Sequence, residues 1–184
     1  MYECYKHGIV EGRDSFPPLW IIGENLLYVA TWVAAGWLLL PAKLAGWPVA
    51  TIGWALFVVT LQVLLKKHNC SGCFYYGKSC HLGWGRLAAM LFPPDSGEPK
   101  MGMRLAVPMY MASPPLVLVA AVVLGVLLPV GLDHWIVLGV YVALNAASFS
   151  LRKVGCAQCK MRAVCPGSAA KTSGSPSAQP PDIA

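Results

Sequence analysis

The sequence predicts an all-α integral membrane protein in which four transmembrane helices form two tandem hairpins. Of its 184 residues, 57% are hydrophobic and only 12% are charged, a composition that excludes an ordinary soluble domain. Four apolar stretches account for this excess, and each is near the roughly 20 residues that a helix needs to cross ~30 Å of hydrocarbon. They cover residues 19–40, 47–65, 105–130 and 135–151.

Short links predict how these spans pair. Residues 41–46 join the first two spans and residues 131–134 join the last two, so each pair is expected to form antiparallel neighbours. The chain then divides into an N-terminal segment 1–18, a first hairpin 19–65, a cysteine loop 66–104, a second hairpin 105–151, a second cysteine loop 152–166 and a tail 167–184, whose Ser, Ala, Pro and Gly predict disorder.

The distribution of basic residues predicts the orientation. Four spans place both termini and the 66–104 loop on one side, and that side carries all but one of the 14 Lys and Arg residues; the exception is Lys43. Positive charge concentrates in the cytoplasm, so we expect a multi-pass protein of the cell inner membrane with both termini cytoplasmic. Basic residues beside the spans would meet anionic lipid, so the net charge of +6 does not indicate nucleic acid as a partner.

A cysteine-containing pattern occurs twice, each time directly after a hairpin. Residues 65–73 read Leu-Lys-Lys-His-Asn-Cys-Ser-Gly-Cys, and residues 151–159 read Leu-Arg-Lys-Val-Gly-Cys-Ala-Gln-Cys. A third cysteine follows each copy, Cys80 in the first and Cys165 in the second. Self-similarity at a fixed offset indicates one structural unit used twice.

The repeated cysteines predict metal ligation. All seven cysteines lie on the side assigned to the cytosol, where thiols stay reduced, so ligation is favoured over disulfides. Zinc takes four N or S ligands, and iron–sulfur clusters are held mainly by thiolates. Each copy offers three thiols, so a fourth ligand is needed: His81 or His68 for the first copy, and Cys4 for the second. The predicted ligands are Cys70, Cys73, Cys80, Cys156, Cys159, Cys165, Cys4 and His81.

The number of sites and the identity of the metal stay open. Two separate sites would use this whole set, whereas four of the six repeat thiols could instead share one cluster on a pseudo-twofold axis. The second copy ends in Cys165-Pro166, as bacterial ferredoxin cysteine runs do, but Met161 and Arg162 stand where such a run has its middle cysteine. We expect an iron–sulfur cluster such as 4Fe-4S, with zinc as the alternative cofactor. Reduced thiols without metal, including lipid-modified ones, are the third alternative.

Residues 70–92 resemble a set of small uncharacterised prokaryotic membrane proteins. The likeness rests on the pattern C-x2-C-x-YYGK-x-C-x2-G-x-G, which runs from Cys70 to Gly85. It covers a small part of the chain and implies a similar membrane-protein loop without a known activity. The aromatic and basic side chains within it are expected to anchor the loop at the level of the lipid headgroups; they are Tyr75, Tyr76 and Lys78.

Two side-chain patterns predict local packing. Apolar side chains at helical spacing indicate a short helix that lies in the membrane interface after the first cysteine loop; they are Trp84, Leu87, Ala88 and Leu91. In the fourth span, small residues four positions apart predict a close contact with another helix; they are Gly139, Ala143 and Ala147.

The third predicted span contains prolines. Pro108, Pro114 and Pro115 each remove a backbone donor, so a kink or broken turn is expected near Ser113. Irregular backbone within a membrane is tolerated only against protein or water. We therefore expect this span to pack inside the bundle or beside a cavity.

Polar residues in the spans lie at a similar depth, ~6–10 Å below the cytoplasmic surface for a rise of ~1.5 Å per residue. They form either an interhelical hydrogen-bond layer or the floor of a ligand pocket. Glu24 is the candidate catalytic residue, because a carboxyl group at this depth must be protonated, hydrated or paired with a cation such as Lys66 or Arg104. The layer comprises Glu24, Asn25, Gln62, Tyr110 and Asn145.

These features lead to a hypothesis of electron transfer between a soluble donor and a membrane partner. Basic surroundings favour the thiolate form of cysteine and attract an acidic protein, so an acidic soluble electron carrier or other membrane subunits are the expected partners. One alternative is a non-enzymatic scaffold or assembly subunit stapled by zinc. Another is a carrier of soft metal ions.

Overall fold

The computed structural model describes residues 1–2, 6, 8–165 and 167–170. This part of the chain contains helices and isolated β-bridges but no strand. The helices are α2 (Pro18–Leu38), α3 (Val49–Leu65), η1 (Lys66–Cys70), α4 (Trp84–Leu91), α5 (Pro99–Val107), η2 (Pro108–Ala112), α6 (Ser113–Leu127) and α7 (Leu132–Ala157). The disorder predicted for the tail falls mostly on residues 171–184, outside the described residues.

Four helical stretches are long and apolar enough to cross a membrane, which confirms the prediction of four spans. They are Pro18–Leu38, Val49–Cys70, Pro99–Leu127 and Leu132–Ala157. Large apolar side chains such as Leu26, Val33 and Leu56 are about two-thirds exposed on the outside of the bundle. Such a surface is stable in lipid and costly in water, so the chain is a multi-pass membrane protein.

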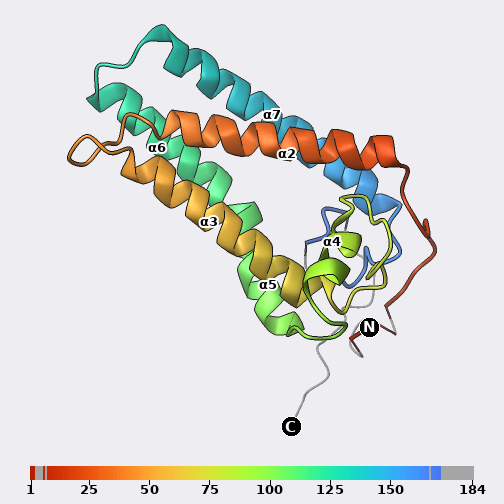
Figure 1. The fold of residues 1–184 in the computed structure, drawn as a ribbon. Helices are drawn as coiled ribbons and strands as arrows, with labels where there is room; N and C mark the ends of the chain where they lie inside the picture. The colour runs from red at the N-terminus through yellow and green to blue at the C-terminus, as the bar shows by residue number, and fades with distance from the viewer. Residues whose placement is uncertain (3–5, 7, 166, 171–184) are drawn as a thin grey trace.

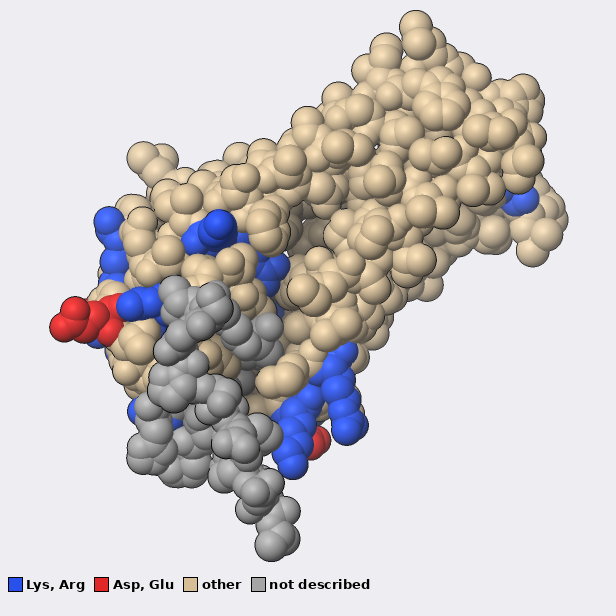
Figure 2. Space-filling model, turned by 180° about the vertical axis from the view of Figure 1, so that it is seen from behind, with Lys and Arg blue, Asp and Glu red and all other residues tan. Residues whose placement is uncertain are grey.

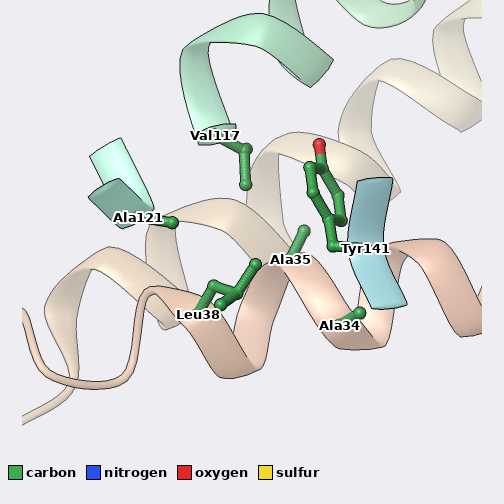
Figure 3. Packing of buried hydrophobic residues seen from close by; sticks show 6 residues of the cluster. All are labelled: Ala34, Ala35, Leu38, Val117, Ala121 and Tyr141. Atoms are coloured by element: carbon green, nitrogen blue, oxygen red, sulfur yellow. The ribbon is translucent and has the colours of Figure 1, made fainter. Parts of the chain in front are cut away.

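The spans pack as one bundle in which the first and last helices lie along each other (Figure 1). Helix α2 also contacts α3 and α6, and α6 contacts α7. Figure 3 shows the core where α2, α6 and α7 meet, built from Ala34, Ala35, Leu38, Val117, Ala121 and Tyr141. Because the main contact joins the first span to the last, the grouping into two separate hairpins stays a prediction.

The small residues of the fourth span do not form the predicted close contact with another helix of this chain. Gly139, Ala143 and Ala147 are exposed on α7, and the closest packing uses the alanines of α2 and α6 instead. The buried side of α7 includes His134, Tyr141 and Ser148, which recur every seven residues. At ~100° per residue, the three small residues fall on the opposite side of the helix from that series.

The irregularity predicted for the third span is present as a π-helical segment. η2 spans Pro108–Ala112 between α5 and α6 and ends directly before Ser113. Proline removes a backbone donor and disturbs the regular helix ladder, and single π-helical turns often occur at functional sites. The short helix predicted after the first cysteine loop is also confirmed as α4, and its location in the membrane interface stays a prediction.

The described residues of 1–17, 71–98 and 158–170 form a head at one end of the bundle (Figure 1). The N-terminal segment joins the other two parts through backbone hydrogen bonds. The Tyr2 and Phe16 amides donate to the first cysteine loop, at Gly72 O and Ser79 O, both at 3.0 Å. The segment also donates to the second loop, through Val10 N to Lys160 O (3.0 Å) and Arg13 N to Gln158 O (2.9 Å).

The close packing of the head predicts that Gly85→Ala strongly lowers the stability of the fold. A Cβ atom at Gly85 would overlap the carbonyl oxygen of Tyr75, and backbone atoms cannot move aside cheaply. We expect overpacking to lower the free energy of unfolding by about 1–3 kcal/mol, measured as a lower melting temperature in detergent. Gly139→Ala is the control, since its Cβ would meet nothing within 4 Å. Equal melting temperatures for the two variants would contradict the packing described here.

Candidate functional site

The six described cysteines lie at the head end of the bundle, and the two copies of the repeat share a local backbone. In the first copy, Cys73 N donates to Cys70 O at 3.3 Å. In the second copy, the equivalent bond runs from Cys159 N to Cys156 O at 3.0 Å. The repeated spacing therefore has the same backbone hydrogen bond in both copies, and Cys70 and Cys156 lie at the ends of η1 and α7 rather than in loops.

Tyr75 joins the two cysteine loops. Its hydroxyl donates to Arg13 O at 2.5 Å and accepts from Lys160 N at 3.1 Å, so it links the N-terminal segment with the second loop. Only 1% of Tyr75 is exposed. The prediction that Tyr75 anchors the loop at the headgroups is therefore wrong: the hydroxyl of this ring finds its partners inside the protein.

The thiols of both loops share one apolar environment. Cys159 is buried in a cluster with Tyr2, Phe16, Tyr75 and Met161. Against this cluster pack three partly buried cysteines, of which two come from the first loop and one from the second: Cys73, Cys80 and Cys165.

Electrostatic coupling indicates which thiols are neighbours. Burial raises the pKa of the Cys73 thiol well above its ordinary value, and negative charge at Cys70, Cys165 and Cys80 raises it further. Burial also raises the pKa of Cys159 to about 12, and Cys165 adds to this shift. Cys165 therefore lies near thiols of both loops. Thiolates in such a place are costly unless a cation compensates them, as a bound metal does.

The spacing of these groups does not match a single metal ion. Among the described residues, no three Cys, His, Asp or Glu side chains are grouped closely enough to hold one ion. A tetrahedral zinc site with bonds of ~2.3 Å would need its sulfurs about 4 Å apart. Cys4 lies outside the described residues.

Glu24 and His81 form a buried pair between the bundle and the head. Glu24 on α2 is fully buried, and its carboxyl oxygens lie 2.8 and 3.0 Å from His81 Nδ1. Trp20 Nε1 donates to the same carboxyl group at 3.0 Å. On the other side of the ring, His81 Nε2 lies 3.8 Å from Cys156 Sγ. A chain of contacts thus runs from the first span through the first loop to the last helix.

Of the states predicted for Glu24 (protonated, hydrated, or paired with a cation such as Lys66 or Arg104), the structure gives a pair, and the partner is a histidine. Lys66 Nζ donates to Gln62 Oε1 at 3.3 Å and lies 4.5 Å from the Trp84 ring centroid. Burial by itself lowers the pKa of His81, but Cys156 and Glu24 outweigh it and raise the pKa to about 10. His81 is therefore engaged with Glu24 and with a cysteine of the second copy of the repeat.

The predicted polar layer divides into two parts. Asn25 belongs to the attachment of the head, because its Nδ2 donates to Leu82 O at 2.9 Å and its Oδ1 accepts from Trp84 Nε1 at 3.2 Å. Tyr110 and Asn145 instead line a cavity within the bundle. The hydrogen-bond layer therefore describes Asn25, and the pocket describes Tyr110 and Asn145.

Comparison with models of protein families, with curated proteins and with solved structures finds no match to this chain. We therefore infer the function from the geometry of the head and the chemistry of its thiols.

A double-mutant cycle tests the Glu24–His81 contact. We expect Glu24→Gln and His81→Phe each to lower the free energy of unfolding, because each leaves a buried polar partner unsatisfied. The loss of unfolding free energy in the double variant should be smaller than the sum of the two single losses. The difference, which is the coupling energy, should be about 1–3 kcal/mol for a buried charged contact. Melting in detergent gives all four values. Strictly additive losses would show that the two side chains do not interact.

Proposed function

We propose that this protein transfers electrons at the cytoplasmic face of a membrane through one iron–sulfur cluster held by Cys70, Cys73, Cys80 and Cys165. Three ligands come from the first copy of the repeat and one from the second. The cluster would supply one-electron chemistry, and the described residues supply its ligands and its apolar surroundings. Cys156 and Cys159 are not ligands in this proposal.

The supporting observation is the position of Cys165. It packs with Cys73 and Cys80 against one apolar cluster. Four thiols drawn from two loops provide the complete ligand set that such clusters use. One shared site of this kind needs neither Cys4 nor His81, and it explains why His81 is free to pair with Glu24.

The choice of iron–sulfur over zinc rests on the all-thiol ligand set and on the Cys165-Pro166 ending, which ferredoxin cysteine runs share. Burial of the thiols in apolar surroundings also suits a redox centre, because limited solvent exposure tunes its potential.

The expected partner is an acidic soluble electron carrier. Lys and Arg side chains gather at the head end of the molecule, while the middle of the bundle carries almost no charge (Figure 2). Arg13 and Lys78 are among the exposed basic residues of the head. Complementary charge speeds the encounter of such proteins and orients them.

Iron and sulfide analysis tests the proposed cluster. The protein, purified without oxygen, should be brown and contain ~4 iron and ~4 labile sulfide per chain, as a cluster held by four thiolates does. Cys73→Ser and Cys165→Ser should lose both elements, because each removes a ligand. Cys156→Ser is the matched control and should keep them.

Three outcomes would contradict this proposal. A colourless protein with bound zinc would support the scaffold instead. Loss of about half of the iron in Cys156→Ser would indicate two separate sites rather than one. A protein without any bound metal would exclude both kinds of site.

The orientation has its own test, in which a membrane-impermeant maleimide is added to intact cells. Lys43→Cys introduces a thiol in the link between α2 and α3, and Lys78→Cys introduces one in the head. The positive-inside rule predicts that Lys43→Cys gains label and that Lys78→Cys gains it only after cell lysis. Labelling of Lys78→Cys in intact cells would place the head outside the cytoplasm and remove the basis of the proposal.

A further inference from the structure

A cavity of about 240 Å³ lies among α2, α3, η2 and α7, beside the π-helical segment. It is small for a whole drug-sized ligand, since such pockets are commonly ~300–1,000 Å³, but large enough for one ring system. Irregular backbone at membrane depth is tolerated where it lines protein or a cavity. Pro114 of the third span lines this cavity, together with residues of the π-helical segment.

One face of α7 supplies polar groups to this cavity. Tyr141, Asn145, Ser148 and Arg152 follow each other at intervals of three or four residues, so they lie on the same side of the helix. Arg152 lies at the head end of this row. The amide nitrogen of Asn145 donates to Tyr141 O at 2.8 Å, which directs its carbonyl oxygen elsewhere as an acceptor. Polar and ionisable groups within a span are functional candidates by default.

Arg152 is held in place at the mouth of the cavity. Its guanidinium Cζ lies 4.0 Å from the Tyr110 ring centroid, and Nη1 donates to the Tyr28 hydroxyl at 3.4 Å. Nη2 donates to Gly167 O at 2.5 Å, two residues after Cys165. A guanidinium has five N–H donors, more than these two bonds use. The same side chain thus lines the cavity and contacts the loop that carries Cys165.

The remaining walls are mostly aromatic and apolar, with the hydroxyl groups of Thr31 and Ser113 among them, and the cavity reaches the outer surface of the bundle. Trp32 and Trp54 line it from α2 and α3. Met111 and Phe149, which also line it, are 74% and 62% exposed on the lipid-facing side. A second hollow of about 140 Å³ shares Tyr110, Met111, Phe149 and Arg152 with the first and continues toward the head.

We propose that this cavity binds the headgroup of a prenylated quinone. Its flat ring fits between the aromatic walls, its carbonyl oxygens accept hydrogen bonds from Arg152, and its isoprenoid tail leaves past Met111 and Phe149 into the bilayer. Aromatic walls and a single cation favour a neutral ring with acceptor oxygens over a lipid phosphate. The quinone's role as the membrane electron partner rests on the proposed function, whereas its binding does not.

Binding of decylubiquinone to the purified protein in detergent tests this proposal. Quenching of tryptophan fluorescence should saturate, because Trp32 and Trp54 line the cavity. Arg152→Gln should weaken binding about 10-fold or more, as the loss of a hydrogen bond from a charged donor does. Lys153→Gln is the matched control, since Lys153 is the next residue, carries the same charge and is exposed outside the cavity; its affinity should not change.

Two further measurements keep the test decisive if Arg152→Gln fails to fold. Ser148→Leu fills the cavity while it keeps the guanidinium of Arg152, and it should abolish saturable quenching. In the unmodified protein, a photoreactive azidoquinone should label peptides that contain Trp32, Trp54 or residues 145–152. Label only elsewhere, or equal affinity in the variants and the control, would overturn the proposal. Arg152-dependent binding of phosphatidic acid micelles without quinone binding would overturn it in favour of a lipid phosphate site.

The same preparations separate this inference from the proposed function. Quinone binding by a protein without iron would support the quinone site and contradict the proposed iron–sulfur cluster. An iron–sulfur protein that does not bind quinone would support the cluster and contradict the quinone site.

Discussion

The contact between Glu24 and His81 is the constraint on which the arrangement of the head depends. A carboxyl group buried in apolar surroundings is stable only when hydrogen-bonded or paired, and Glu24 has no exposed surface. Its partner comes from 57 positions later in the chain, so the first cysteine loop must fold back onto α2. Asn25 reinforces this contact by bonding to Leu82 and Trp84. Together they fix the loop just after Cys80, and His81 Nε2 in turn faces Cys156 at the end of α7.

The N-terminal segment explains why a duplicated motif leads to one thiol environment rather than two. It forms backbone hydrogen bonds with both loops, and Tyr75 adds a bond to each of the segment and the second loop. The loops are thereby held face to face around one apolar cluster. The repeat determines the local turns, while the segment determines which thiols become neighbours. This is the physical basis for proposing a single shared cluster.

The head and the cavity in the bundle are connected through Arg152. Its guanidinium stacks on Tyr110 of the π-helical segment and donates to Gly167 in the chain that follows Cys165. The prolines of the third span lack the backbone N–H that a regular helix uses. The cavity beside the π-helical segment is lined by hydroxyl, amide and guanidinium groups. A ligand in this cavity would therefore contact the same arginine that binds the chain two residues after Cys165.

The sequence by itself determined the four spans, the helix at Trp84–Leu91, the irregular third span and the repeated cysteine turns. Hydrophobic length, helical periodicity, proline chemistry and residue spacing are local properties, so they can be recognised without the fold. Only the tertiary structure decided that Glu24 pairs with His81, that Tyr75 is buried, that Cys165 joins the first loop's thiols and that Gly139 faces outward. Each of these depends on how segments far apart in the chain pack, and the sequence holds no local signal that fixes the rotation of one helix against another.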